Sequence, residues 1–312
     1  MNLNVFLLNV AKALKRVPYG ASISRAFNSF RHRHIAEQFD SICDQVAREM
    51  NVSGADVQFE EAVNDGPVWV FWWQGLESAP ARVKACVDSI KRNAANRDVI
   101  VITKDNVSKY TDLPDYVFRK LAEGKITLTH FSDILRFNLL KLHGGLWMDA
   151  TLYAVRPLDS HRYSGRFFTC SGYPDSTFFN VSDGRWTGFF IGGVREEPLF
   201  EFMDRFFALY WERNNSLADY FLIDYALDYA YRNGIGSLKT WCEGERRKDN
   251  PELFDLAPVI CDSFDSNVWK RLTEHTDVFK LSWKKPASYP EGSFGGRLVK
   301  EMFFDNTEGN AS

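Results

Sequence analysis

With 312 residues, the chain is long enough for one large domain, or for one domain with a helical extension. Its composition, 45% hydrophobic and 25% charged, is typical of a globular protein, and no apolar run reaches the ~18–20 residues of a membrane span. The net charge of −3 is unevenly placed, because residues 1–34 carry six lysines and arginines and no acid. A basic start on an acidic body argues against nucleic-acid binding and predicts a local surface for anions.

Several functional classes are disfavoured by missing motifs. The five cysteines are scattered and odd in number, which indicates a reducing compartment and predicts a cytoplasmic protein. The apolar run Leu3–Val10 is short and has no small-residue cleavage site nearby, so a secretory signal is not expected. The chain has no HExxH, GxGxxG or GxxxxGK[ST], which argues against a zincin, a nucleotide-dependent dehydrogenase and a P-loop NTPase.

The first 66 residues are predicted to form a helical extension and a linker. Apolar residues recur at helical spacing over 3–14, and a second helical stretch is expected over about 22–50, followed by a polar linker over 51–66. The basic, amphipathic character of residues 1–34 is compatible with peripheral binding to anionic lipid headgroups at the inner face of the plasma membrane. Packing of these helices on the domain, with their basic residues in solvent, explains the pattern equally well.

Strands alternate with helices from residue 67 onward. Buried strands are expected over 68–73, 98–103 and 146–148, separated by helices over 80–92, 113–122 and 131–142. Such alternation predicts an α/β fold with a mostly parallel central sheet flanked by helices. Ligands collect at the carboxyl ends of the strands in such sheets, where Gln74 and Asp149 are expected to lie.

The pattern after Pro157 is more mixed. It predicts strands over 166–171, 188–191 and 278–281, and helices over 198–213 and 216–232. Residues 306–312 are expected to be a frayed tail.

The most specific stretch of the chain runs from Thr129 to Thr151. Asp133 and Arg136 are three residues apart and share a helix face, where they form either an intrahelical ion pair or a site for sugar hydroxyls and phosphate oxygens. Gly144-Gly145 then ends the helix, and a short apolar strand leads to Asp149. Asp149 is a candidate ligand for a hard divalent cation that neutralises a diphosphate, with Thr151 adding a hydroxyl; a turn or helix-cap role is the alternative.

The chain resembles the capsular polysaccharide synthesis family of bacterial glycosyltransferases. That family is similar to the wider group with a DxD sugar-binding motif, which includes fungal Golgi mannosyltransferases (family 32) and large glucosylating toxins. The matching segments lie between Pro67 and Lys285 and read W-V-F-W-W-Q-G (69–75), S-D-I-L-R (132–136), G-G-L-W-M-D-A-T (144–151), D-Y-F-L-I-D-Y-A-L (219–227) and K-L-S-W-K (280–284).

The resemblance implies a GT-A fold over residues 67–305, in which a Rossmann-like half binds a nucleotide-sugar with Mn²⁺ or Mg²⁺. It places Trp72 near the nucleotide base, Asp133 and Arg136 on the donor sugar, and Asp149 at the first acid of the DxD motif. Thr151 stands where the wider group has its second acid, although D-A-T is normal for the capsular branch.

Further candidates rest on weaker signals. Gln74, Lys280 and Lys284 are expected at the donor, where the two lysines would stabilise a leaving diphosphate or else form a solvated basic face. His275 is a candidate late metal ligand, with a surface role as the alternative. Asp219 and Asp224 flank an apolar stretch and are expected to line an acceptor pocket, unless Asp219 caps a helix.

The sequence therefore predicts a glycosyltransferase with Asp133, Arg136 and Asp149 as its catalytic residues. The expected donor is a UDP-sugar, and the acceptor a glycan or lipid-linked oligosaccharide in capsular or other surface polysaccharide synthesis. Retention of anomeric configuration is inferred from the related families. The alternative is a non-catalytic subunit that binds a nucleotide or glycan in a polysaccharide-assembly complex, which the missing second acid would favour.

Overall fold

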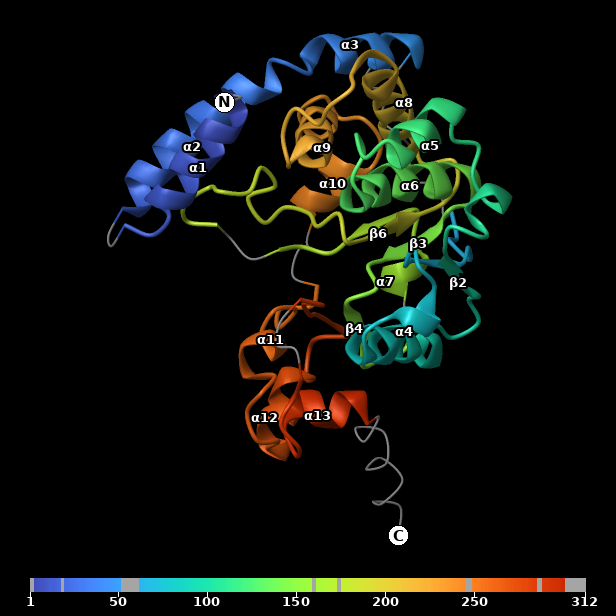
Figure 1. Cartoon of the computed structure of the whole chain (residues 1–312), viewed down its shortest axis with the longest axis vertical. Coiled ribbons are helices and arrows are strands. Elements are labelled where there is room, and N and C mark those ends of the chain that lie inside the picture. Colours follow the sequence, from blue (N-terminus) through green and yellow to red (C-terminus); the bar gives the residue numbers. More distant parts are fainter. Residues whose placement is uncertain are drawn as a thin grey trace.

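The computed structural model describes residues 3–17, 20–51, 62–158, 161–172, 175–244, 249–284 and 288–300. These residues form an α/β structure in which helices cover both faces of a central sheet (Figure 1). The expected α/β class is confirmed. The expected frayed tail over 306–312 and most of the linker over 51–66 lie outside the described residues.

The central sheet has five strands in the order β2-β1-β3-β6-β5. Their bounds are Val68–Phe71 (β1), Val99–Ile102 (β2), Gly145–Met148 (β3), Phe167–Thr169 (β5) and Phe190–Gly193 (β6). β1 pairs in parallel with β2 and β3, whereas β6 is antiparallel to both β3 and β5. Only β6 therefore runs against the other four strands, and the prediction of a mostly parallel sheet is confirmed.

Each strand of the sheet supplies side chains to two hydrophobic layers, because successive residues point to opposite faces. Trp69 and Trp147 pack on one face with helices α3 (Asp40–Glu49), α5 (Asp115–Ala122), α6 (Leu128–His143), α8 (Pro198–Arg213) and α9 (Leu222–Arg232). Val68, Val70 and Met148 pack on the other face with α4 (Ala81–Asn93). Both faces of the sheet are thus buried, which explains why the strands read as continuous apolar runs rather than as alternating ones.

The double glycine before β3 is required by the backbone. Gly144 and Gly145 have φ angles of +64° and +97°, a region that favours glycine. A Cβ on Gly145 would lie 2.2 Å from the carbonyl oxygen of Pro67, so a side chain there would push β1 and β3 apart. The turn therefore sets the register that brings Asp149 to the carboxyl edge of the sheet.

Most expected helices are present, with some shifted boundaries. The helices of the main body are α3 (Asp40–Glu49), α4 (Ala81–Asn93), α5 (Asp115–Ala122), α6 (Leu128–His143), α8 (Pro198–Arg213) and α9 (Leu222–Arg232). α6 begins three residues earlier than expected because the Thr127 side chain accepts a hydrogen bond from the backbone N–H of His130. α9 begins later than residue 216 because the Tyr210 hydroxyl binds the backbone of Ser216 and Ala218 and holds that segment as a loop.

A second, two-stranded sheet was not foreseen in full. β4 (Leu152–Ala154) pairs antiparallel with β7 (Val278–Lys280), so that Leu152 lies opposite Lys280. A third hydrophobic cluster joins this sheet to α4 and to the C-terminal helices. The short helices of the remaining chain are α7 (His161–Ser164), α10 (Leu238–Glu243), α11 (Leu256–Val259), α12 (Ser266–Leu272) and α13 (Phe294–Val299).

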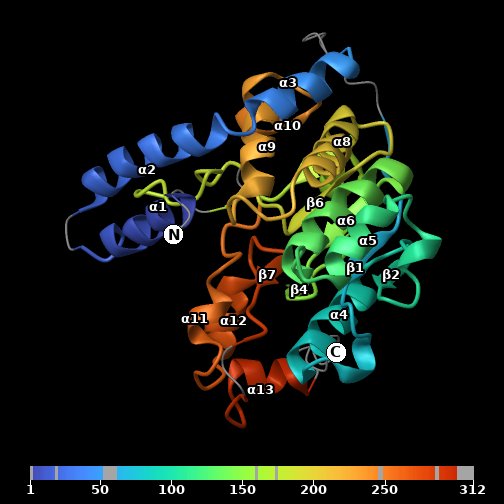
Figure 2. The same cartoon turned by 45° about the horizontal axis from the view of Figure 1, so that its top comes forward.

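The N-terminal region consists of three helices rather than two. α1 (Leu3–Leu14) and α2 (Ala21–Ala36) lie side by side and extend away from the sheet, whereas α3 lies across the helical layer formed by α8 and α9 (Figures 1 and 2). Phe39, where the expected helix over 22–50 breaks, packs its ring against Tyr210 and Tyr225. α3 shares the main hydrophobic core, and the boundary expected at residue 67 stays a prediction.

The arm formed by α1 and α2 uses part of its positive charge for contacts within the chain. Arg25 forms an ion pair with Asp183 at 2.7 Å, and the buried Arg31 donates a hydrogen bond to the carbonyl of Phe179 at 2.6 Å. Lys12, Arg16 and Arg33 are exposed. None of the helices in the described part of the chain is both long enough and apolar enough to cross a bilayer.

Candidate active site

Two neighbouring cavities lie at the carboxyl edge of the parallel strands. The larger has a volume of about 640 Å³ and is bounded by the ends of β1 and β3, the start of α6 and residues 280–284. The smaller has a volume of about 240 Å³ and is bounded by α6, the approach to β6 and the start of α9. Thr129, Ser132 and Asp149 line both cavities, so Asp149 lies where the two meet.

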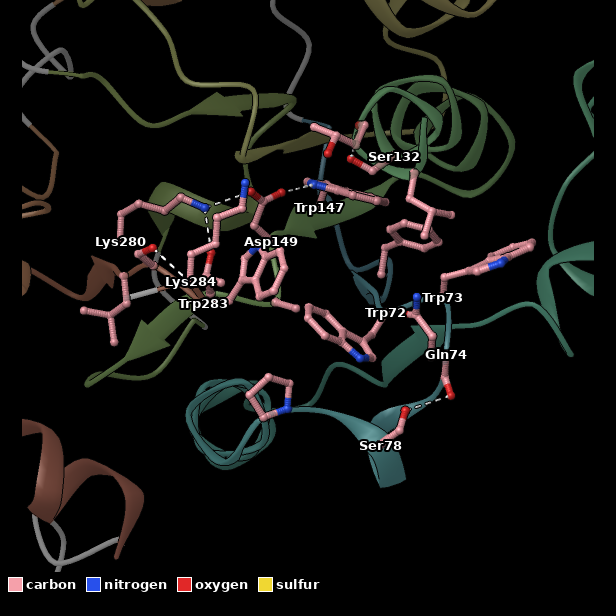
Figure 3. Close-up of a pocket in the computed structure, with 18 residues that line it drawn as sticks. Trp72, Trp73, Gln74, Ser78, Ser132, Trp147, Asp149, Lys280, Trp283 and Lys284 are labelled. Carbon is pink, nitrogen blue, oxygen red and sulfur yellow. Dashed lines mark hydrogen bonds and ion pairs between the residues drawn. The ribbon is translucent and has the colours of Figure 1, made fainter. Parts of the chain in front are cut away.

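Asp149 is held by three groups from different parts of the chain. Its Oδ1 accepts a hydrogen bond from Trp147 Nε1 at 3.0 Å, and its Oδ2 accepts one from Lys280 Nζ at 2.8 Å (Figure 3). Arg136 Nη2 lies 3.7 Å from Oδ1. Burial alone would raise the pKa of Asp149, but the charges of Lys280 and Arg136 outweigh it and hold that pKa below its ordinary value. Asp149 is therefore an anion at neutral pH.

Asp133 and Arg136 form the intrahelical ion pair that their spacing predicts, and both also face the smaller cavity. Arg136 Nη1 donates to Asp133 Oδ1 at 3.1 Å, and the Arg136 side chain is only 4% exposed. Its guanidinium lies over the Trp147 ring, 5.0 Å from the centroid. A Cβ on Gly188 would lie 3.0 Å from Arg136 Nη1, so the glycine leaves room for this arrangement. The three predicted catalytic residues thus converge at one place.

Lys280 reaches the site from a strand 131 residues away in sequence from Asp149. Its Nζ donates hydrogen bonds to Asp149 Oδ2 and, at 2.7 Å, to Thr151 Oγ1. It also lies 4.7 Å from the centroid of the Phe189 ring. Lys284 lines the same cavity (Figure 3), and its Nζ lies 5.5 Å from the centroid of the Trp283 ring. Both expected donor lysines therefore face the larger cavity.

Aromatic rings form two walls of the larger cavity. Trp72, at the end of β1, meets Trp283 edge to face with ring centroids 6.2 Å apart, and both line the cavity (Figure 3). Trp73 and Gln74 also line it, whereas Trp69 is buried in the core and donates to the carbonyl of Gly144. The apolar walls and the charged Asp149–Lys280 edge suit a ligand with a flat ring at one end and anionic groups at the other.

Asp224 lies in the wall of the smaller cavity. Its Oδ1 accepts a hydrogen bond from Trp186 Nε1 at 3.0 Å. The pKa of Asp224 is raised to about 6, mainly by burial and also by the nearby carboxylate of Asp133, while the Trp186 hydrogen bond and the charge of Arg136 oppose the rise. This carboxyl therefore changes its charge close to neutral pH.

Two of the expected site residues do not reach either cavity. Asp219 Oδ1 accepts a hydrogen bond from the backbone N–H of Phe221 at 2.8 Å, within the turn that precedes α9, and it lines neither cavity. His275 is 69% exposed and lies 3.8 Å from Glu274, away from Asp149 and Thr151. Asp219 is therefore a structural residue in the turn before α9, and His275 belongs to the surface.

Sequence reasoning overlooked several residues that line the cavities. Trp283 lies in the segment K-L-S-W-K and Ser132 in the segment S-D-I-L-R, so both are close in sequence to charged candidates. This closeness is the one sequence feature that could have indicated their place in the cavity. Tyr220, at the mouth of the smaller cavity, is adjacent to Asp219 in sequence. His130 accepts a hydrogen bond from Trp211 Nε1 and lies 3.5 Å from Asp133 Oδ2, a contact that no sequence pattern indicates.

The residues around Asp149 fit a divalent cation poorly. Asp149 is the only carboxylate among the three expected metal ligands, and an ammonium group already occupies the space between it and Thr151. Within the described ranges, no group of three or more His, Cys, Asp or Glu side chains is placed to hold a metal ion. One carboxylate together with phosphate oxygens and water can be enough for a hard cation such as Mg²⁺, so the poor fit comes from the ammonium group of Lys280 and not from the number of acids. The expected role of Mn²⁺ or Mg²⁺ stays a prediction.

The chain belongs to the family described as capsular polysaccharide synthesis protein, whose model matches residues 19–294. It is similar to glycosyltransferase afumC of Aspergillus fumigatus, with 27% identity over 180 residues that cover 53% of this chain and 46% of that protein. It is also similar to O-glycosyltransferase braB of Annulohypoxylon truncatum, with 28% identity over 105 residues that cover 31% of this chain and 25% of that protein.

The matched part of this chain thus spans less than half the length of these two relatives. Among solved structures, the PaToxG glycosyltransferase aligns with 88% of this chain and 98% of its own, at a TM-score of 0.43 and 14% identity. The family match begins at residue 19 and so includes α2 and α3, in agreement with the packing of α3 on the main core.

Proposed function

We propose that the protein is a glycosyltransferase that moves a sugar from a nucleotide-sugar donor to a hydroxyl of a glycan or lipid-linked acceptor. The observation that carries this proposal is the meeting of two cavities at Asp149, with Arg136 and Lys280 beside its carboxylate. The family match and the names of the two relatives support the same class of reaction. The sheet order and the covered faces support the GT-A arrangement that the sequence resemblance implies.

The donor is proposed to lie across the junction of the cavities. The larger cavity, at about 640 Å³, is in the size range of small-molecule sites and offers the Trp72 and Trp283 rings to a base. The diphosphate would then lie beside Lys280, and the sugar would reach the smaller cavity, where Asp133 and Arg136 are available for its hydroxyls. The acceptor would enter from the side of Tyr220 and Asp224.

The chemistry in this arrangement is the transfer of a glycosyl group. The bond between the anomeric carbon and the β-phosphate oxygen breaks, and its electron pair stays on that oxygen. The acceptor hydroxyl oxygen forms the new bond to the anomeric carbon. In a retaining reaction both oxygens lie on the same face of the sugar, so the departing phosphate oxygen can take up the hydroxyl proton. Lys280 and Arg136 would stabilise the charge that develops on the phosphate.

The experiment that tests the function is a thermal-shift screen of UDP- and GDP-sugars, followed by a turnover assay on every donor that stabilises the protein. Asp149→Ala should lower turnover at least about 100-fold, the usual order for removing a group that organises transition-state charge, while its circular dichroism stays native. Retained turnover in this variant would contradict the proposed site. Tight donor binding without any cleavage, in the presence of candidate acceptors, would favour the non-catalytic binding subunit.

The proposed product is a capsular or other surface polysaccharide, made from a UDP-sugar with retention of configuration at the anomeric carbon. We also propose that residues 1–34 contact the inner face of the membrane. Lys12, Arg16 and Arg33 are exposed on the arm, together with the apolar Phe6 and Phe30. Anionic lipid attracts such surfaces by charge and by apolar burial. Changing Lys12, Arg16 and Arg33 together to glutamate should lower co-sedimentation with anionic vesicles; unchanged partitioning would remove the membrane proposal.

A further inference from the structure

The ammonium group of Lys280 lies between Asp149 and Thr151, the two positions expected to hold a divalent cation. It donates to Asp149 Oδ2 at 2.8 Å and to Thr151 Oγ1 at 2.7 Å, and it faces the Phe189 ring. The Lys280 side chain is 20% exposed and lines the larger cavity (Figure 3). The positive charge is therefore accessible to a ligand in that cavity.

The position of this ammonium is fixed by the backbone around it. Lys280 ends β7 and is paired with Leu152 of β4, directly after Thr151. Its backbone N–H donates to the carbonyl of Leu253 at 2.7 Å, and the N–H of Leu281 donates to the carbonyl of Thr151 at 2.9 Å. These bonds on both sides hold the lysine stem beside Asp149, so the charge is in place before a ligand binds.

The charges at this point match those of a metal site with two acids. A divalent cation on two carboxylates has no net charge, and neither does the Asp149–Lys280 pair. Thr151, which replaces the second acid, removes one negative charge, while the ammonium carries one positive charge fewer than a divalent ion. The Thr151 hydroxyl accepts a hydrogen bond from the ammonium group. A carboxylate at position 151 could accept the same bond, but it would leave the site with a net negative charge.

We propose that Lys280 takes the place of the divalent cation, so that this chain binds the diphosphate of its donor and transfers the sugar without a metal ion. The inference rests on the proposed function and identifies how the same site stabilises its leaving group. An ammonium has three hydrogens, and two of them contact Asp149 and Thr151, which leaves the third for a β-phosphate oxygen. As the glycosidic bond breaks, Lys280 keeps its proton and stabilises the phosphate charge through this hydrogen bond.

Asp149 acts as a positioning residue in this scheme. Its carboxylate holds Lys280 on one oxygen and the Trp147 indole on the other, with Arg136 at 3.7 Å. Arg136 provides a second positive group on the side of the smaller cavity. A diphosphate placed between the two cavities would therefore meet a cation on each side.

The test is the binding of UDP and of GDP to the whole chain by titration calorimetry, in excess EDTA and in Mn²⁺. The wild-type protein should bind one of the two nucleotides in EDTA, and Mn²⁺ should change its Kd less than about threefold. Lys280→Met should weaken this binding at least about tenfold and lower donor turnover about 100-fold, the order seen when one preorganised donor is removed. Lys270→Met, the same change at an exposed lysine on α12, is the matched control and should bind like the wild type.

The outcomes separate this inference from the function it rests on. Binding or turnover that requires Mn²⁺ in the wild-type protein would overturn metal-independence and leave glycosyl transfer standing. Absence of nucleotide binding and of turnover under both conditions would overturn both. If Lys280→Met fails to fold, the comparison of EDTA with Mn²⁺ in the wild-type protein decides the question alone. Binding in EDTA that Lys280→Met leaves unchanged would also overturn the role of Lys280.

Discussion

Asp224→Asn should make the stability of the protein less sensitive to pH. Asp224 lies in the wall of the smaller cavity and bonds to the Trp186 indole, and burial raises its pKa from 3.8 to about 6. Asparagine has nearly the same shape and keeps an oxygen for the indole N–H, but it cannot ionise. The substitution therefore isolates the contribution of this one titration.

The sign and size of the effect follow from the raised pKa. A carboxyl that binds its proton more tightly in the folded state stabilises that state below pH 3.8, and this contribution is lost as the pH rises through about 6. A change from 3.8 to about 6 corresponds to about 3 kcal/mol at ~1.36 kcal/mol per tenfold change in proton affinity, and partial access to water reduces it to about 1–3 kcal/mol. Relative to the wild type, Asp224→Asn should thus gain this amount between pH 4 and pH 7.

The assay is urea unfolding of both proteins at half-unit steps from pH 4 to pH 8, with the difference in unfolding free energy plotted against pH. The difference should rise through the pH 4–6 range and level off near pH 7. Asp105→Asn, on an exposed loop, controls for the exchange of a carboxylate for an amide. A difference curve that is flat, or that falls with pH, would refute the argument that burial of Asp224 sets its proton affinity.

Three further outcomes are expected at the site. Trp72→Ala should weaken nucleotide binding, measured by calorimetry, about tenfold, because a ring stacked on a base contributes ~1–3 kcal/mol. Unchanged binding would show that the Trp72 ring does not contact the nucleotide. Gly188→Ala should lower turnover about tenfold, because the new Cβ would lie 3.0 Å from Arg136 Nη1 and displace the guanidinium. Full activity, with a melting temperature within a few degrees of the wild type, would show that the guanidinium position is not critical. The double variant Thr151→Asp, Lys280→Met recreates two acids without the ammonium, and we expect Mn²⁺ to restore turnover that EDTA abolishes; activity independent of Mn²⁺ would argue against exchange of the lysine for a cation.

The central part of the site could be predicted because its residues are close in sequence and sit on regular elements. Asp133 and Arg136 share one face of α6, and Asp149 follows β3 after a glycine turn, so 17 residues of chain carry the three predicted catalytic groups. Helical periodicity, the Gly144-Gly145 stop and the rule for strand ends are local or nearly local signals. They fix where these side chains point once the sheet is formed.

Contacts between distant segments were beyond the sequence. β4 and β7 have only three residues each, too few to show a period, and their pairing alone brings Lys280 to Asp149 across 131 residues. Asp219 and Asp224 look alike as carboxylates flanking an apolar run, yet Asp219 bonds the backbone of the turn before α9 and Asp224 faces the cavity. Whether each of these carboxylates faces solvent, backbone or a cavity depends on the segments packed against it, and those segments are distant in sequence.

The sequence by itself determined the α/β class, the mostly parallel sheet, the place of Asp149 at its carboxyl edge and the shared helix face of Asp133 and Arg136. These follow from backbone geometry and side-chain periods of two and 3.6 residues, whereas the place of Asp133 and Arg136 at the donor came from the family resemblance. Only the tertiary structure decided that Trp283 faces Trp72, that two cavities meet at Asp149, and that an ammonium stands between Asp149 and Thr151. These depend on long-range packing, where the free energy of burying many side chains together selects one arrangement among several that local preferences allow.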